Sequence, residues 1–282
     1  MSRTAALPGR GVIEVSGEDR VSFLQGLVSN DVALAAPGRA VWSALLTPQG
    51  KFIADFFIFA GDARLLLDAE RALLPDLVAR LSRYRLRARV TLRDASAEFA
   101  VWAGWDGAPP PAGITAPDPR LPEAGWRSLA PAAAANEAHG DNTEPEDGAG
   151  AAAWDLHRLR LGLPDGTRDL EPGKSILLEA GFDELGGVSW SKGCYMGQEL
   201  TARTRYRGLI KRRLLPVAVE GALPPPGTPV LRDGAEAGTM RSGRDGTGLA
   251  LLRLDALEGP LLCGGATLTP RIPAWARLPE PA

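Results

Sequence analysis

Cysteine and histidine are scarce in this chain of 282 residues, which has two of each. Cys194 and Cys263 lie 69 positions apart without a CxxC pair. This spacing argues against a disulfide framework and against a structural zinc site. His139 falls in a low-complexity stretch and His157 on an expected helix, so a Ser-His-Asp triad has little support. Neither a GxxxxGK[ST] phosphate loop nor a Rossmann GxGxxG motif is present.

Lysine is also rare, and charge of either sign is nearly balanced. Acidic residues number 34 and basic residues 32, which gives a formal net charge of -2. A global basic field for DNA is therefore absent, and the balance argues against RNA as well, apart from a local patch. The four lysines are Lys51, Lys174, Lys192 and Lys211.

Long apolar runs are missing too. No segment approaches the roughly 20 apolar residues that a membrane helix needs. The first ten residues lack the apolar core of a signal peptide, and two unpaired cysteines fit a reducing compartment. We therefore expect a cytoplasmic protein without a membrane partner.

What is present is an apolar content of 45%, enough for a sizeable core in two domains. Strand and helix patterns alternate in the larger, N-terminal part, which predicts an α+β fold. A hairpin is expected around the turn Thr47-Pro48-Gln49-Gly50, between strands at 41–46 and 51–60. Further strands are expected at 12–15 and 64–68, and helices at 18–28 and 71–83.

The later part of the chain changes texture. Two stretches, 106–113 and 130–150, are rich in Pro, Ala, Gly and acidic residues, and we expect the second to be flexible or disordered. A short strand is expected at 125–129 and a helix at 154–161. Short Gly-punctuated strands from 214 to 268 predict a small β-barrel. The expected domains are therefore 1–212 and 213–282.

The run Ser191-Lys192-Gly193-Cys194-Tyr195-Met196-Gly197-Gln198-Glu199 is the best candidate for chemistry. A nearby cation such as Lys192 stabilises a thiolate, the form of cysteine that attacks, binds metal or oxidises. The glycines permit positive φ and close approach of a ligand to the main chain. Cys194 is therefore predicted to be functional. Cys263, in the apolar run Pro260-Leu261-Leu262-Cys263, is predicted to be structural.

Two sets of arginines are spaced by two residues. Arg203, Arg205 and Arg207 would share one face of an extended segment, where guanidinium groups suit carboxylates or phosphates. A solvated strand face or linker is the equally weighted alternative. Arg85, Arg87 and Arg89 alternate with apolar residues, which predicts a half-buried strand.

Two further residues attract attention. Asp55 lies in the second hairpin strand among Phe52, Ile53, Phe56 and Phe57. A carboxylate there must face outward, be paired, or serve chemistry. Trp154 opens an expected helix and can either cap the core or stack on a flat heterocycle.

The sequence around Cys194 resembles the signature of a known family. Lys192-Gly193-Cys194-Tyr195-Met196-Gly197-Gln198-Glu199 looks like the KGCYxGQE signature of the YgfZ family of folate-binding proteins, which are related to the aminomethyltransferase of the glycine cleavage system. The resemblance covers nearly the whole chain except its low-complexity middle, and it is greatest to the branch of the mitochondrial iron–sulfur assembly factor. Supporting matches are Phe23–Asp31, Leu46–Lys51, Tyr84–Ala88, His157–Gly166 and Gly208–Arg213.

The resemblance implies ferredoxin-like units in a ring around a folate channel, followed by a C-terminal β-barrel. It implies a role in making or repairing 4Fe–4S clusters, with assembly or client proteins as partners, tetrahydrofolate as the ligand and no resident metal. Chemistry would involve Cys194, Lys192 and Asp55. Trp154 is implied to contact the cofactor, and the further residues that we expect to bind it are Tyr195, Gln198, Glu199, Arg203 and Arg205.

One position departs from the aminomethyltransferases. Their Arg-Leu-Glu-Ala-Gly run carries a glutamate that holds the pteridine, and the matching run here is Arg158-Leu159-Arg160-Leu161-Gly162. A carboxylate accepts hydrogen bonds from an aminopyrimidine edge and a guanidinium accepts none. Folate would therefore sit differently or bind weakly.

Three functions follow. The preferred one is a folate-binding accessory protein for iron–sulfur assembly with Cys194 as its thiol. The second is a folate-dependent one-carbon transferase using Asp55, so enzymatic activity stays open. The third is a non-enzymatic RNA or protein adaptor using the patch from Arg203 to Arg213, whose binding would fall steeply with salt.

Overall fold

The computed structural model describes residues 3–107, 109, 113–133 and 147–278. In the stretch that begins at residue 147, side chains are described from residue 150 onward. These residues form two compact units that interleave along the chain. The first unit takes its residues from Met1–Leu46, Ala54–Trp154 and Gly186–Met196. The second takes them from Thr47–Ile53, Asp155–Leu185 and Gly197–Ala282.

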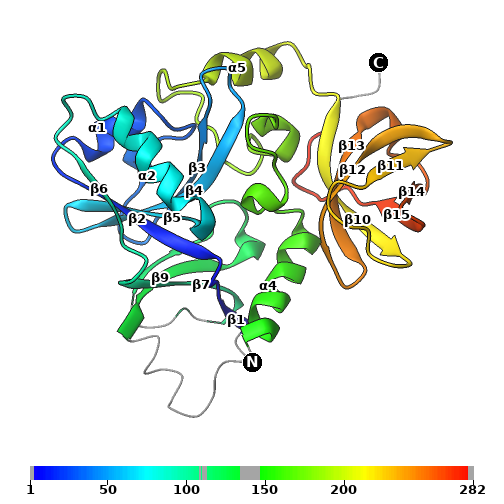
Figure 1. Cartoon of the computed structure of the whole chain (residues 1–282), viewed down its shortest axis with the longest axis horizontal. Helices are drawn as coiled ribbons and strands as arrows, with labels where there is room; N and C mark the ends of the chain where they lie inside the picture. Colours follow the sequence, from blue (N-terminus) through cyan, green and yellow to red (C-terminus); the bar gives the residue numbers. More distant parts are fainter. Residues whose placement is uncertain (1–2, 108, 110–112, 134–146, 279–282) are drawn as a thin grey trace. The chain divides into compact units, whose positions relative to one another are not determined.

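The first unit contains a five-stranded sheet in the order β3-β4-β5-β2-β6. Antiparallel pairing joins β4 to β5, β5 to β2 and β2 to β6, and α2 packs on β2 and β6 (Figure 1). Its elements are β2 (Arg10–Ser16), α1 (Arg20–Gln25), β3 (Val41–Leu46), β4 (Phe52–Gly61), β5 (Arg64–Glu70), α2 (Leu74–Arg83) and β6 (Thr91–Asp94).

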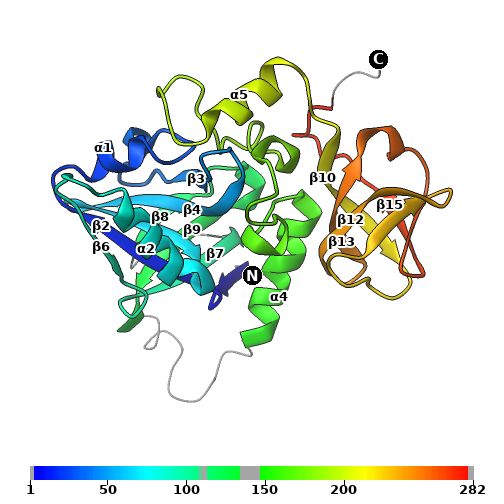
Figure 2. The same ribbon diagram turned by 45° about the horizontal axis from the view of Figure 1, so that its top comes forward.

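A second, four-stranded antiparallel sheet of the order β1-β7-β9-β8 completes this unit. Its strands are β1 (Arg3–Ala6), β7 (Phe99–Asp106), β8 (Ile114–Pro117) and β9 (Trp126–Pro131). Figure 1 and Figure 2 show the two sheets as layers, one in blue to cyan and the other mostly in green, with β1 in dark blue.

Between these sheets lies a layer of buried charge rather than a purely apolar core. The guanidinium of Arg127 on β9 lies 3.9 Å from the ring centroid of Phe57 on β4, and it pairs with the fully buried Asp68 of β5. Arg10 also binds Asp68, at 2.6 Å. Burial opposes ionisation of Asp118, but the charge and hydrogen bonds of Arg120 and the charge of Arg127 together outweigh it and lower the pKa of that carboxyl. Paired charges of this kind satisfy each other where single ones would be costly.

The second unit ends in a closed barrel of the order β10-β13-β12-β11-β14-β15. Its strands are β10 (Arg212–Glu220), β11 (Pro229–Arg232), β12 (Ala235–Arg244), β13 (Thr247–Arg253), β14 (Leu261–Cys263) and β15 (Ala266–Pro270). The helices of this part of the chain are α4 (Asp147–Leu161) and α5 (Gln198–Tyr206). Short 3₁₀ helices occur at Val32–Leu34, Arg71–Leu73, Pro122–Ala124, Gly166–Arg168, Leu177–Ala180 and Leu254–Ala256.

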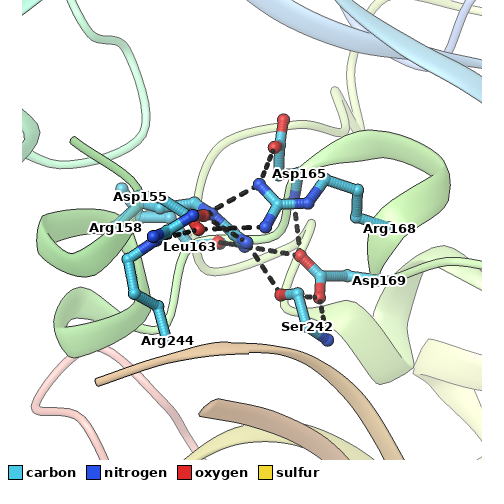
Figure 3. A network of polar contacts seen from close by, with 8 residues as sticks. All are labelled: Asp155, Arg158, Leu163, Asp165, Arg168, Asp169, Ser242 and Arg244. Atoms are coloured by element: carbon cyan, nitrogen blue, oxygen red, sulfur yellow. Dashed lines mark hydrogen bonds and ion pairs between the residues drawn. The ribbon is translucent and has the colours of Figure 1, made fainter. Parts of the chain in front are cut away.

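Inside the second unit, the end of α4 is fixed to the barrel by a buried arginine (Figure 3). Arg158 is 2% exposed and donates to Asp169 at 2.6 Å, to Asp155 at 2.8 Å and to the Ser242 hydroxyl on β12 at 2.7 Å. Arg168 and Arg244 also bind Asp155. Burial opposes ionisation of Asp155, but its hydrogen bond with Arg168 and the neighbouring guanidinium charges outweigh it and lower its pKa to about 2.

The fold confirms the α+β class, the hairpin, the strand in the 125–129 region and the C-terminal barrel. Two predictions were wrong. The segment with Arg85, Arg87 and Arg89 is a turn ahead of β6, and Arg203 and Arg205 lie on helix α5. The expected flexible stretch at 130–150 falls largely on residues outside the described part. Within the described part, none of the helices has both the length and the apolar character needed to span a bilayer.

Candidate functional site

Cys194 lies in an irregular segment, residues 186–196, which we call the cysteine loop. Its side chain is exposed, whereas Cys263 is 1% exposed inside the barrel. Gly193 adopts φ +93° immediately before it, and a Cβ at that position would have no heavy atom within 4 Å. The main chain next to the thiol is therefore open to a visiting group. These positions fit a functional Cys194 and a structural Cys263, and the function of Cys194 stays a prediction.

The cysteine loop is held by the segment that follows α1. Asn30 donates from Nδ2 to the carbonyls of Trp42 at 2.8 Å and Gly186 at 2.6 Å. The Ser29 hydroxyl donates to the Gly187 carbonyl at 2.7 Å. Two main-chain bonds add to these: Ser189 N–H to the Ser29 carbonyl and Met196 N–H to the Gly26 carbonyl. The Phe23–Asp31 and Lys192–Glu199 sequence motifs thus meet in one hydrogen-bonded structure that presents Cys194.

Lys192 closes this structure at the end of α1. Its Nζ donates to the carbonyls of Gln25 and Val28, both at 2.6 Å, and lies 5.1 Å from the ring centroid of Tyr195. The Gln25 carbonyl ends α1 and lacks a helical partner, so a cation there satisfies it and interacts favourably with the helix dipole. Burial lowers the pKa of Lys192 to about 8, opposed by the charge of Asp31. These contacts make Lys192 a positioning residue for the loop, and its effect on the Cys194 thiolate stays a prediction.

The Thr47–Gly50 turn supports α5 inside the second unit. Gly50 has φ +80°, and a Cβ there would lie 2.6 Å from Leu200 Cβ and 2.7 Å from the Gly197 carbonyl oxygen. Gly197 itself adopts φ +80° as the residue before α5. Both glycines are therefore required by conformation, and Gly50 also by close packing. The Leu46–Lys51 motif is explained by this contact.

The predicted ligand-binding residues of α5 make local ion pairs. Glu199 is on the first turn, with a side chain 90% exposed, and lies 4.0 Å from Arg203. Arg205 lies 3.6 Å from Asp183. Because residues two apart on a helix point about 200° apart, Arg203 and Arg205 do not share a face. Gln198 is the first residue of the helix.

The basic patch expected from Arg203 to Arg213 is also partly internal. Arg213 is 1% exposed and donates to Glu184 at 2.7 Å and to the Leu178 carbonyl. Arg212 donates to Glu179 at 3.1 Å. These pairs neutralise part of the patch, so it is not a continuous solvated surface for phosphates.

Trp154 does not open α4 but lies within it and is 6% exposed. Its ring centroid lies 5.6 Å from that of Trp105 and 5.8 Å from the guanidinium of Arg127. Tyr195 is 8% exposed, and Arg160 is exposed. The aromatic surface is thus used inside the protein, and the Arg160 guanidinium is a donor that cannot accept hydrogen bonds from an aminopyrimidine edge. These residues do not fit a folate stacked on Trp154.

Asp55 is buried, at 4% exposure, on β4. Its Oδ2 accepts a hydrogen bond from the Trp42 indole at 2.8 Å, and the Arg120 guanidinium lies over the Trp42 ring at 5.5 Å. Asp55 is therefore paired and tied to the charge layer between the sheets. Trp42 also lines a cavity of about 340 Å³ in the first unit, together with Asn30 and Arg39.

Sequence reasoning missed the two buried charge networks. A signal for the first exists in β5, where Asp68 interrupts the apolar residues Leu65, Leu66 and Leu67. The sequence identifies Arg158 only as part of the motif at 157–166. Its partners Asp169 and Ser242 are 11 and 84 positions away, so the network depends on the fold.

Comparison with known proteins gives three findings. A family model described as the CAF17 C-terminal beta-barrel domain matches residues 211–278. The iron–sulfur cluster assembly factor IBA57 of Mus musculus is 35% identical over 90% of this chain and 78% of its own length, and that of Homo sapiens is 34% identical over the same shares. A homolog in Mycosarcoma maydis is 39% identical over 79% of this chain, which spans 59% of that protein.

A solved structure shows the same fold. The glycine cleavage system aminomethyltransferase T from Bartonella henselae superposes with a TM-score of 0.75, over 98% of this chain and 86% of that one, at 15% identity. This likeness confirms the predicted aminomethyltransferase-like fold.

The comparisons also correct the expected cellular location. The matched proteins of Mycosarcoma maydis, mouse and human are mitochondrial by name. The prediction of a cytoplasmic location was wrong, because composition and cysteine content report a reducing environment but do not identify the compartment.

Proposed function

Because this chain belongs to the family of the iron–sulfur cluster assembly factor IBA57, we propose that it assists the assembly of 4Fe–4S clusters through the thiol of Cys194. The observation that carries the proposal is the exposure of Cys194 on a loop held by the Ser29, Asn30 and Lys192 hydrogen bonds.

The thiol would act as one iron ligand among several. Cysteine binds iron as the thiolate, so binding releases a proton to solvent. A 4Fe–4S cluster usually takes four thiolates, and Cys263 is buried in the barrel. The remaining ligands would come from a partner protein or from small thiols. The open main chain at Gly193 leaves room for such a partner beside Cys194.

Anaerobic reconstitution of the purified protein with ferrous iron, sulfide and glutathione tests this proposal. The wild type should retain a cluster with thiolate-to-iron absorption after desalting, and Cys194→Ser should retain none. Cys263→Ala serves as the matched control and should behave like the wild type. Equal cluster retention by Cys194→Ser and the wild type would overturn the proposal.

Tetrahydrofolate is supported by the aminomethyltransferase-like fold alone. Because Trp154 packs against Trp105 and the exposed Arg160 can donate but not accept hydrogen bonds, these residues do not fit a bound folate. Titration of the wild type and Trp154→Ala with tetrahydrofolate tests this point. We expect no saturable binding to the wild type, whereas binding that Trp154→Ala removes would restore folate as a ligand.

The transferase alternative is not favoured by the geometry. The Asp55 carboxylate is buried and accepts a hydrogen bond from Trp42, which holds it within the protein. If Asp55 served one-carbon transfer, Asp55→Asn would abolish the function of the protein in cells without lowering thermal stability. We expect instead that it lowers stability.

A further inference from the structure

The turn that follows α2 presents a leucine to solvent in an unfavourable conformation. The N–H of Ala88 donates to the Arg85 carbonyl at 2.7 Å and closes the turn. Leu86 within it has φ +43° and is 89% exposed. We call residues 84–88 the Leu86 turn. It begins where α2 ends in Figure 1.

The fold gives no reason for a leucine at this position. Residues with a Cβ are disfavoured at positive φ, and glycine adopts such φ values without strain. An exposed side chain adds no burial that could offset this strain. Leu86 is therefore a position where the folded chain by itself would favour glycine, which suggests that its side chain serves a contact outside the chain.

Exposed cationic side chains flank Leu86 along the chain. Four arginines are exposed, and within the described residues none of them makes an ion pair: Arg80, Arg83, Arg85 and Arg87. By contrast, Arg89 pairs with Glu18 at 2.6 Å, and its N–H donates to Asp19 at 2.7 Å, which anchors the turn. Arg80 and Arg83 lie on the last turn of α2, where a cation interacts favourably with the helix dipole. That explanation does not extend to Arg85 and Arg87.

We propose that the Leu86 turn and the end of α2 form a docking surface for an acidic protein. A central apolar side chain with arginines and the 37% exposed Tyr84 around it matches the composition of protein interfaces. The partner would carry a small apolar hollow for Leu86, rimmed by Asp and Glu. A leucine adds little to phosphate binding, and one leucine is a weak membrane anchor, so RNA and lipid are disfavoured. This surface is independent of Cys194 and goes beyond the proposed function.

Photo-crosslinking identifies the partner. A benzophenone amino acid is introduced at Leu86 in cells that depend on this protein, and at Leu262, which is 60% exposed in the barrel, as the control. We expect one acidic protein crosslinked from position 86 and absent from position 262. No such adduct, or an adduct with RNA or lipid only, would overturn the proposal.

Binding of the purified partner, measured by calorimetry, then tests the mechanism. Leu86→Gly should leave the melting temperature unchanged or higher, because the strain is removed, yet weaken binding by about tenfold or more. The pair Arg85→Glu and Arg87→Glu should weaken it similarly and reduce its salt dependence. Arg39→Glu, an exposed arginine on another loop, is the charge control. Unchanged affinity in Leu86→Gly would overturn the proposal and leave the Cys194 function intact.

Discussion

Cys194 and Cys263 carry the same thiol in opposite surroundings, and this contrast is the residue-scale basis of the proposed function. Cys194 is exposed on its loop, and burial raises the pKa of the Cys263 thiol. Because the thiolate is the reactive form, iodoacetamide should modify Cys194 in the folded protein and spare Cys263. Mass spectrometry of the labelled peptides checks this. Labelling of Cys263 ahead of Cys194 would contradict the environments described.

Lys192 predicts a pH dependence of stability. Its pKa is lowered from the ordinary 10.5 to about 8, mainly by burial. Between these values the unfolded chain binds more protons than the folded one, so this group makes the free energy of unfolding rise with pH from about 8 to 10.5. The free energy of unfolding of Lys192→Met should not show this rise. The variant should also loosen the cysteine loop, because it loses the hydrogen bonds to the Gln25 and Val28 carbonyls. Urea unfolding across this pH range measures the difference, and an identical slope in both proteins would refute it.

Among the elements, the turn at Thr47–Gly50 makes the sharpest structural demand. A methyl group at Gly50 would lie 2.6 Å from Leu200 Cβ, and φ is +80°. We expect Gly50→Ala to lower the free energy of unfolding by about 2 kcal/mol through clash and strain. Gly173→Ala is the matched control, since it has φ +76° but no atom within 4 Å of a Cβ. Equal losses in the two variants would mean that packing against α5 is unimportant.

The sequence could predict elements whose pattern agrees with their packing. The hairpin of β3 and β4 and the helix around 74–83 were recovered because apolar periodicity and turn residues agree there. Arg85, Arg87 and Arg89 have the period of a strand, but the turn closed at Arg85–Ala88 overrides it. The strand prediction for Arg203 and Arg205 was wrong for a different reason. Helix α5 has few apolar residues, so the sequence shows no helical period there.

The candidate site was predicted at Cys194 and only partly around it. The two motifs at 23–31 and 192–199 could be recognised separately, but the hydrogen bonds that join Ser29 and Asn30 to the loop span more than 150 positions. Contacts of that separation depend on the fold. The cofactor role of Trp154 stays a prediction that its packing against Trp105 does not support.

For the molecule as a whole, the network in Figure 3 predicts sensitivity to acid. The pKa of Asp155 is lowered from the ordinary 3.8 to about 2, so its contribution is present above pH 3.8 and is lost as pH falls toward 2. Asp155→Asn removes one of the two carboxylates that pair with the buried Arg158, and also the shared partner of Arg168 and Arg244, and should lower stability at neutral pH by about 3 kcal/mol. Calorimetry at neutral and acidic pH checks this. A variant as stable as the wild type would show that the network is dispensable.

The similarity to an aminomethyltransferase at 15% identity and a TM-score of 0.75 shows a shared fold. Within this chain, Asp55 is tied to Trp42, Arg160 is exposed, and the exposed thiol is at Cys194. The division into domains 1–212 and 213–282 remains a proposal. The two compact units of the structure are each made of three separate segments of the chain.

The central claim is that the folded chain presents the Cys194 thiol for cluster assembly. The most direct measurement is the activity of 4Fe–4S enzymes in cells lacking this protein that receive the wild type, Cys194→Ser or Cys263→Ala at equal soluble abundance. We predict recovery with the wild type and Cys263→Ala and none with Cys194→Ser. Full recovery of 4Fe–4S enzyme activity with Cys194→Ser would contradict the account.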